Sequence, residues 1–178
     1  TAYQSQGMWF ARHGYVCLVL DTLQLGEIAG IHHGTYREGR WWWLSRGYTP
    51  AGVECWNGVR GVDYLQSLPQ VDPSRIGCGG LSLGGEMAMW LGAMDERIAA
   101  TVSAGFLTMM DHMEQNHCMC WKFDGLRELV DFADIYSLTA PRPLQCQNGL
   151  REPESQFYVP LAREAMQEIR VIYDDTGK

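Results

Sequence analysis

The chain has 178 residues, a mass of 20.1 kDa and a formal net charge of −7 at pH 7. Its 46% hydrophobic and 20% charged residues exclude a disordered chain and are typical of one folded domain. The acidic balance predicts no nucleic-acid partner, because such binding rests on clustered lysines and arginines. Apolar runs stay well short of the roughly 20 residues that a membrane span needs, so we predict no membrane partner.

The first part of the chain predicts a helix, a strand and a second helix around a long irregular segment. Residues 3–12 have a helical pattern, and the apolar run Gly14–Asp21 is typical of a strand buried on both faces. Residues 22–50 show no clean period, and long loops of this kind often carry function. Thr49-Pro50 then begins a helix that ends before Pro69. Its apolar residues fall on about one face: Val53, Trp56, Val59, Val62 and Leu65.

The second part of the chain continues the alternation. We predict strands over 75–79, 98–103 and 143–147, helices over 86–94 and 159–172, and helical pieces between 106 and 136. Strands that alternate with helices predict an α/β domain with a mostly parallel sheet. The length and the lack of an internal repeat predict a single domain over 1–178.

One motif in the chain carries chemistry. Gly80-Leu81-Ser82-Leu83-Gly84 matches the pattern Gly-x-Ser-x-Gly, in which a serine sits on a sharp turn between a strand and a helix. Glycines flank such a serine because side chains would collide where the backbone doubles back. The motif alone is also compatible with a plain glycine-rich turn. Because a predicted strand precedes it and a predicted helix follows it, we interpret Ser82 as a catalytic nucleophile.

The start of the following helix predicts a second role. The backbone N–H of Leu83 lies where unpaired amides and the helix dipole favour negative charge. We therefore predict that Leu83 is one donor of an oxyanion hole. Glu86, in the first turn of the same helix, is interpreted as a residue that offsets the dipole rather than as a catalytic acid.

The six cysteines predict no disulfide framework, because a chain of this size and apolar content can build a core without one. We interpret them as mostly free thiols. The cluster His117-Cys118-Met119-Cys120, with His112 nearby, is the only hint of a metal in the sequence. Because structural zinc sites need a second pair of ligands, which this cluster lacks, we predict no metal site.

Several motifs together resemble α/β-hydrolases of the acetyl xylan esterase and dienelactone-hydrolase-like group. The resemblance rests on Ser45–Glu54, Val71–Gly77, Gly80–Gly85, Leu138–Leu144 and Asn148-Gly149. It implies a three-layer α/β sandwich, with Ser82 as nucleophile and Glu152 as the triad acid in the place where the family usually has Asp before Pro. Asp111 is the alternative acid. It further implies that the N- and C-terminal strands of the fold are missing, so that the chain is a partial domain.

The order expected for this fold is serine, acid, histidine, and no histidine follows Glu152 in the sequence. We therefore expect the triad histidine to lie outside the chain, together with the second oxyanion donor. The resemblance places His32 and His33 in a loop that often lines the substrate pocket. Trp42, within Trp41–Trp43, is a further candidate because it could stack on a sugar, although such clusters more often pack on the core.

These interpretations predict a serine hydrolase that acts on carboxylic esters, with acetyl esters of carbohydrates as the substrate that the resemblance implies. Its mechanism requires neither a metal nor an organic cofactor. Two alternatives remain: a catalytically inactive hydrolase fragment or binding module, and a peptidase similar to prolyl oligopeptidases. Because open strand edges tend to be paired or covered, we expect the Tyr15–Leu20 and Arg75–Gly79 strands either to pair directly or to be closed by another chain in a homodimer.

Overall fold

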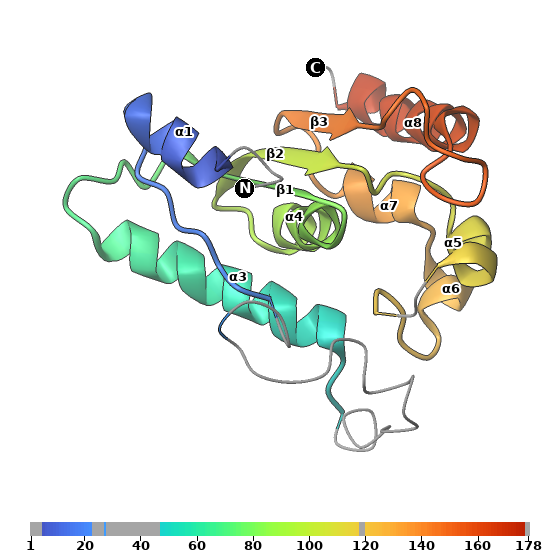
Figure 1. Ribbon diagram of the computed structural model, residues 1–178, viewed down its shortest axis with the longest axis horizontal. Helices are drawn as coiled ribbons and strands as arrows, with labels where there is room; N and C mark the ends of the chain where they lie inside the picture. Colours follow the sequence, from blue (N-terminus) through green and yellow to red (C-terminus); the bar gives the residue numbers. More distant parts are fainter. Residues whose placement is uncertain (1–4, 23–26, 28–46, 118–119, 177–178) are drawn as a thin grey trace.

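The computed structural model describes residues 5–22, 27, 47–117 and 120–176 (Figure 1). Its helices and strands are, in chain order, α1 (Gln6–Arg12), α3 (Pro50–Ser67), β1 (Ile76–Leu81), α4 (Leu83–Met94), β2 (Ile98–Ala104), α5 (Met110–Asn116), α6 (Leu126–Leu129), α7 (Phe132–Ser137), β3 (Leu144–Gln147) and α8 (Val159–Asp175). Within this part of the chain, no helix combines the length and apolar character that crossing a membrane requires. The alternation confirms the predicted α/β class.

The three strands of the described residues form a parallel sheet in the order β1-β2-β3. The register places Leu81 beside Ala104 and Ala104 beside Gln147, so all three strands end at one edge. Two hydrogen bonds extend the ladder past these ends. Ser82 N donates to Ala104 O at 2.8 Å, and Gly105 N donates to Gln147 O at 2.6 Å. The segments that leave the three strands therefore begin next to one another.

Helices cover one face of this sheet. α4 packs on β1 and β2, and α3, α7 and α8 continue the same layer, since α3 and α7 each contact α4 and α8 contacts α7 (Figure 1). Strand side chains that face this layer belong to the core, among them Cys78, Leu144 and Cys146. Because side chains alternate along a strand, the intervening residues face the other way. Those residues, Gly77, Gly79, Leu81, Gln145 and Gln147, are exposed in the described structure.

The α3 helix begins as the sequence predicts. Thr49 is its N-cap, and the Thr49 side chain accepts a hydrogen bond from Gly52 N at 3.0 Å. The predicted buried face is wrong in part, because Trp56 is 60% exposed. The residues of α3 that are buried are Ala51, Glu54, Gly58, Gly61 and Val62. Small residues dominate this face because α3 approaches its neighbours closely: a Cβ added at Gly58 would lie 3.1 Å from a methyl carbon of Leu91 on α4.

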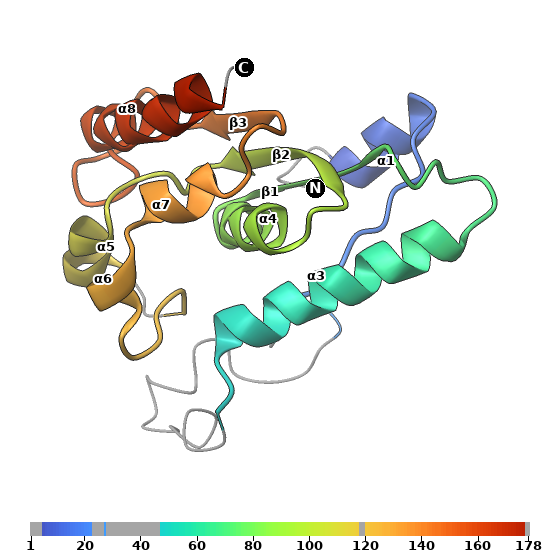
Figure 2. The same ribbon diagram turned by 180° about the vertical axis from the view of Figure 1, so that it is seen from behind.

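The predicted strand over Gly14–Asp21 is wrong. Its residues form no regular secondary structure and do not pair with β1. They run from α1 along α3 (Figure 2), where Leu18 and Leu20 contact the helix beside Gly61. Far from being buried on both faces, every residue from Tyr15 to Leu20 is exposed, and Val19 reaches 73%. The apolar pattern indicated a strand, but among the described residues nothing supplies the ladder that a strand requires.

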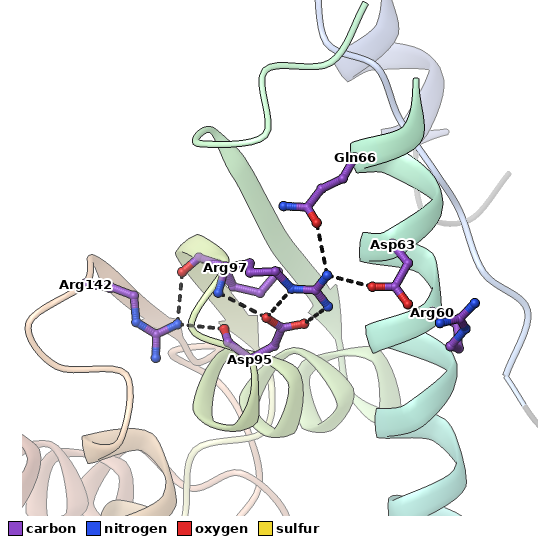
Figure 3. Close-up of polar contacts among 7 residues, drawn as sticks. Arg60, Asp63, Gln66, Asp95, Arg97 and Arg142 are labelled. Carbon is purple, nitrogen blue, oxygen red and sulfur yellow. Dashed lines mark hydrogen bonds and ion pairs between the residues drawn. The ribbon is translucent and has the colours of Figure 1, made fainter. Parts of the chain in front are cut away.

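Arg142, in the turn before β3, holds the end of α4 against the start of β2 (Figure 3). Its guanidinium donates hydrogen bonds of 2.7 to 3.1 Å to the backbone carbonyls of Gly92, Asp95, Ile98 and Leu138. The last carbonyls of a helix have no partner within the helix, so a fixed fork of N–H donors is well suited to satisfy them. One side chain thereby joins the α4–β2 turn to the entry of β3.

A charged network next to Arg142 links this turn to α3 (Figure 3). The Asp95 carboxylate accepts from Arg97 Nε at 2.8 Å and from Arg97 Nη2 at 2.6 Å. Arg97 Nη1 also donates to Asp63 Oδ1 on α3 at 2.6 Å. The hydrogen bonds from the Arg97 side chain hold the pKa of Asp95 below its usual value. Because its folded-state pKa is lowered, Asp95 contributes stability above its ordinary pKa, and this contribution is lost as the pH falls.

We predict that Asp95→Asn reduces the free energy of unfolding by about 1–2 kcal/mol at pH 7, a modest value because solvent screens the partly exposed Arg97. The difference from the wild type should shrink between about pH 5 and pH 2, where the wild-type carboxylate becomes protonated. Urea unfolding at several pH values measures this difference in the free energy of unfolding. Asp124→Asn, on an exposed residue, is the control. A difference that stays constant down to pH 2 would contradict the role of the Asp95 charge.

The predicted homodimer stays a prediction, because the structure holds one chain. The observation that favours it is the exposed apolar run Tyr15–Leu20, together with the side of β1 that has no partner strand among the described residues. We expect Val19→Asp to raise the dimer dissociation constant at least about tenfold, since burial of an unpaired carboxylate is costly. Light scattering over a concentration series measures this dissociation constant, with Leu129→Asp, at an exposed side chain of α6, as control. A wild-type chain that stays monomeric at every concentration would refute the dimer.

Candidate active site

The turn between β1 and α4 has the geometry that the motif predicts for a strained serine. Ser82 has φ 56° and ψ −116°, a backbone conformation that residues with a side chain rarely adopt. Its N–H bonds to Ala104 O on the neighbouring strand, and its carbonyl accepts from Glu86 N at 2.9 Å, the first bond of α4. The serine is exposed. These bonds hold the exposed residue at the C-terminal edge of the sheet.

The start of α4 provides the surroundings predicted for negative charge. Leu83 is the first residue of the helix, and N–H groups in the first turn have no acceptor within the helix. Leu83 thus begins the helix, and its role as an oxyanion donor stays a prediction. Glu86 is only 1% exposed, and its Oε2 lies 3.9 Å from the thiol of Cys120. Its place in the first turn of α4 is the one from which a carboxylate can offset the helix dipole, and this role stays an interpretation.

Two buried hydroxyl groups, on β2 and α7, support this turn from the core side. No sequence motif predicted this pair. Ser103 Oγ on β2 donates to Gly85 O at 2.9 Å and lies 2.6 Å from Tyr136 Oη on α7. Ser103 and Tyr136 are both fully buried. Burial raises the pKa of the Tyr136 hydroxyl well above its usual value, so it remains neutral. The pair holds the first turn of α4 against the sheet.

The predicted acid, Glu152, lies in the loop that follows β3. That loop begins with Asn148 at the same edge of the sheet as Ser82, because the strands are parallel and end together. Glu152 is half-buried, and its N–H donates to Gly149 O at 3.2 Å. The alternative acid, Asp111, lies in the first turn of α5, where its 70% exposed carboxylate forms an ion pair with Arg127. This engagement makes Asp111 the weaker candidate.

The described thiols are free, as the sequence predicts for most of them. Burial raises the pKa of Cys78 to about 11 and that of Cys146 to about 12. Both remain protonated at neutral pH, so neither competes with Ser82 as a nucleophile. Within the residues that the structure describes, no group of three His, Cys, Asp or Glu side chains could hold a metal ion.

Other predicted site residues are not brought to Ser82 within the part of the chain that the structure describes. His32, His33 and Trp42 lie outside the described residues, as does Cys118. His112 Nε2 is 2.8 Å from Gln156 O, a bond that engages it in the fold. The structure therefore gives no base for Ser82 from this histidine.

The chain is similar to known proteins in both sequence and structure. Residues 59–131 match the family described as BAAT / Acyl-CoA thioester hydrolase C terminal. YtaP, a candidate hydrolase of Bacillus subtilis, is 32% identical over 138 residues, which are 73% of this chain and 44% of that protein. The structure of a candidate acetyl xylan esterase from Bacteroides fragilis superposes with a TM-score of 0.76 at 21% identity, over 97% of this chain and 47% of that one.

A glucuronoyl esterase from Solibacter usitatus shares the fold with a TM-score of 0.60 at 20% identity, over 74% of this chain and 38% of its own. Together with the parallel sheet, these likenesses show that the chain has an α/β-hydrolase fold. The relatives named above are hydrolases or esterases by description. The chain spans less than half the length of each of them.

The two glycines that flank Ser82 are predicted to differ in importance. A Cβ at Gly80 would collide with the backbone of Gly84, whereas a Cβ at Gly84 would meet nothing within 4 Å. We expect Gly80→Ala to lower the free energy of unfolding by about 2–4 kcal/mol, because the backbone must move to relieve the collision. Gly84→Ala should change it by less than about 1 kcal/mol. Urea unfolding of both variants measures the difference, and equal losses would contradict this geometry.

Proposed function

We propose that the chain carries the nucleophile and the acid of a serine hydrolase that cleaves carboxylic esters. The single observation that supports this most strongly is the backbone of Ser82, which holds an exposed serine at positive φ between a strand and a helix. The extension to acetyl esters of carbohydrates rests on the esterases that share the fold, among them the candidate acetyl xylan esterase.

The proposed reaction follows from the residues at the sheet edge. Ser82 Oγ attacks the acyl carbon while a histidine base removes its proton. The negative charge that develops on the carbonyl oxygen is stabilised by the N–H of Leu83 at the start of α4. The base returns the proton to the alcohol as it leaves. Water, activated by the same base, then hydrolyses the acyl-serine and regenerates the hydroxyl.

In this mechanism Glu152 orients the histidine and stabilises its protonated form. The sequence has no histidine after Glu152, so we propose that the base comes from polypeptide outside residues 1–178. The same holds for the second oxyanion donor. The relatives are more than twice as long as the parts of them that this chain covers, which supports a contribution from beyond these residues.

A thioester substrate is the second candidate. The observation that favours it is the match of residues 59–131, which include Ser82, to a family described by acyl-CoA thioester hydrolysis. Esters and thioesters react through the same acyl-serine, so the two candidates share the residues of the site. Comparison of acetylated xylan with an acyl-CoA on the same preparation distinguishes them.

We expect Ser82→Ala to reduce hydrolysis of p-nitrophenyl acetate at least about 10³-fold in the full gene product, because no other described group provides the nucleophile. Glu152→Gln should reduce kcat about 10²- to 10⁴-fold, because the histidine loses its orienting charge. Steady-state kinetics measures both losses. Undiminished activity of Ser82→Ala would refute the serine mechanism.

Matched variants separate this outcome from the alternatives. Glu154→Gln removes an exposed carboxylate two residues from Glu152 and should leave activity unchanged. Asp111→Asn should do the same, and a large loss there would make Asp111 the acid. Residues 1–178 that are inactive alone, beside an active full gene product, would favour the inactive fragment, and a full gene product that is inactive on every ester and thioester would favour the binding module. Faster cleavage of peptides than of esters would favour the peptidase.

A further inference from the structure

The loop over residues 148–157 is closed by one side chain. Asn148 is half-buried at the end of β3, and its Nδ2 donates to Leu107 O at 2.9 Å and to Phe157 O at 3.1 Å. Leu107 lies in the segment that leaves β2, and Phe157 lies at the far end of the loop. The amide of Asn148 thus links the start of the loop both to its far end at Phe157 and to the segment that follows β2 at Leu107.

The amide group of Asn148 satisfies both acceptors with its two N–H donors. Both partners are backbone carbonyls, so the nitrogen of the Asn148 amide must face them, and its two N–H groups are both used. An aspartate of the same shape would turn a carboxylate oxygen towards the two carbonyls and repel them. An alanine would leave two partly buried carbonyls without this donor.

Glu152 folds back over the residue next to Asn148. Its N–H donates to Gly149 O, and a Cβ added at Gly149 would lie 3.0 Å from Glu152 Oε1 and 3.3 Å from Glu152 Cγ. The carboxylate therefore rests against the backbone of Gly149, and a side chain there would push it away. The direction of the Glu152 carboxylate depends on how the peptide after Asn148 is held.

Other contacts anchor the far end of the loop independently. The Phe157 side chain is 5% exposed, and its ring centroid is 5.8 Å from that of Phe106. His112 Nε2 lies 2.8 Å from Gln156 O. Removal of the Asn148 amide should therefore loosen the start of the loop without unfolding the domain.

We propose that Asn148 is a positioning residue that fixes the Glu152 carboxylate in the direction from which it orients the triad histidine. This inference rests on the proposed function, in which Glu152 is the acid. Asn148 acts through Glu152 and does not itself contact the substrate. Glycine at position 149 contributes to this positioning, because a larger residue there would displace the Glu152 carboxylate.

The test measures kcat, KM and the melting temperature of the full gene product with p-nitrophenyl acetate. Asn148→Ala and Asn148→Asp should lower kcat about 10- to 100-fold with little change in KM, because a displaced orienting group affects the chemical step. Gly149→Ala should show the same pattern by a different route, since its added methyl group displaces Glu152. Gln156→Ala is the matched control, because only the backbone of this exposed residue bonds within the loop.

A double-mutant cycle distinguishes positioning from a general loss of structure. In a Glu152→Gln background, Asn148→Ala should cause no further loss of kcat. An additive loss, a fall in kcat that merely follows the melting temperature, or unchanged kcat in both Asn148 variants would overturn the inference. If Ser82→Ala and Glu152→Gln are themselves fully active, the proposed function fails. If those two are inactive while both Asn148 variants are normal, only the positioning role fails.

Discussion

The hydrogen-bond ladder that continues past the ends of the three strands is the constraint on which the rest of the structure depends. Ser82 N bonds to Ala104 O, and Gly105 N bonds to Gln147 O. These two bonds carry the parallel register into the segments beyond the strands, so the serine turn, the exit of β2 and the loop that starts at Asn148 share one edge. Without this alignment, a strained serine on one strand and a carboxylate after another would have no fixed relation.

The packing of α4 makes that constraint rigid. The helix starts directly after Ser82, so its position on the sheet sets the direction of the serine turn. Its inner face is buried against β1 and β2, with Met89 fully inaccessible, and Ser103 on β2 bonds to Gly85 in its first turn. At the opposite end of α4, Arg142 satisfies carbonyls that the helix leaves open. Both ends of α4 are thus held by groups from other elements, which keeps a strained turn in place.

Local signals predicted what depends on local geometry. Thr49-Pro50 predicted the start of α3, and the spacing around Ser82 predicted the turn and α4, because capping and steric rules act over a few residues. The run over Gly14–Asp21 has the composition of a strand, but a strand also needs a partner, which composition does not encode. The face of α3 was misjudged at Trp56 because close helix approach selects small residues over large apolar ones. The two hydrogen bonds of the Asn148 amide reach carbonyls 41 and 9 residues away in the sequence, so no local pattern predicted them.

The two glycines of the serine motif differ in what they require: a side chain at position 80 would collide with the backbone, whereas position 84 has open space. Gly80 is required by the path of the backbone, whereas position 84 faces no atom within 4 Å of an added Cβ and stands two residues from the exposed hydroxyl. Side chains of different size at position 84 can therefore change which molecules reach Ser82 while the turn itself stays intact. For the proposed hydrolase, position 84 is therefore a place where selectivity can change while stability is retained.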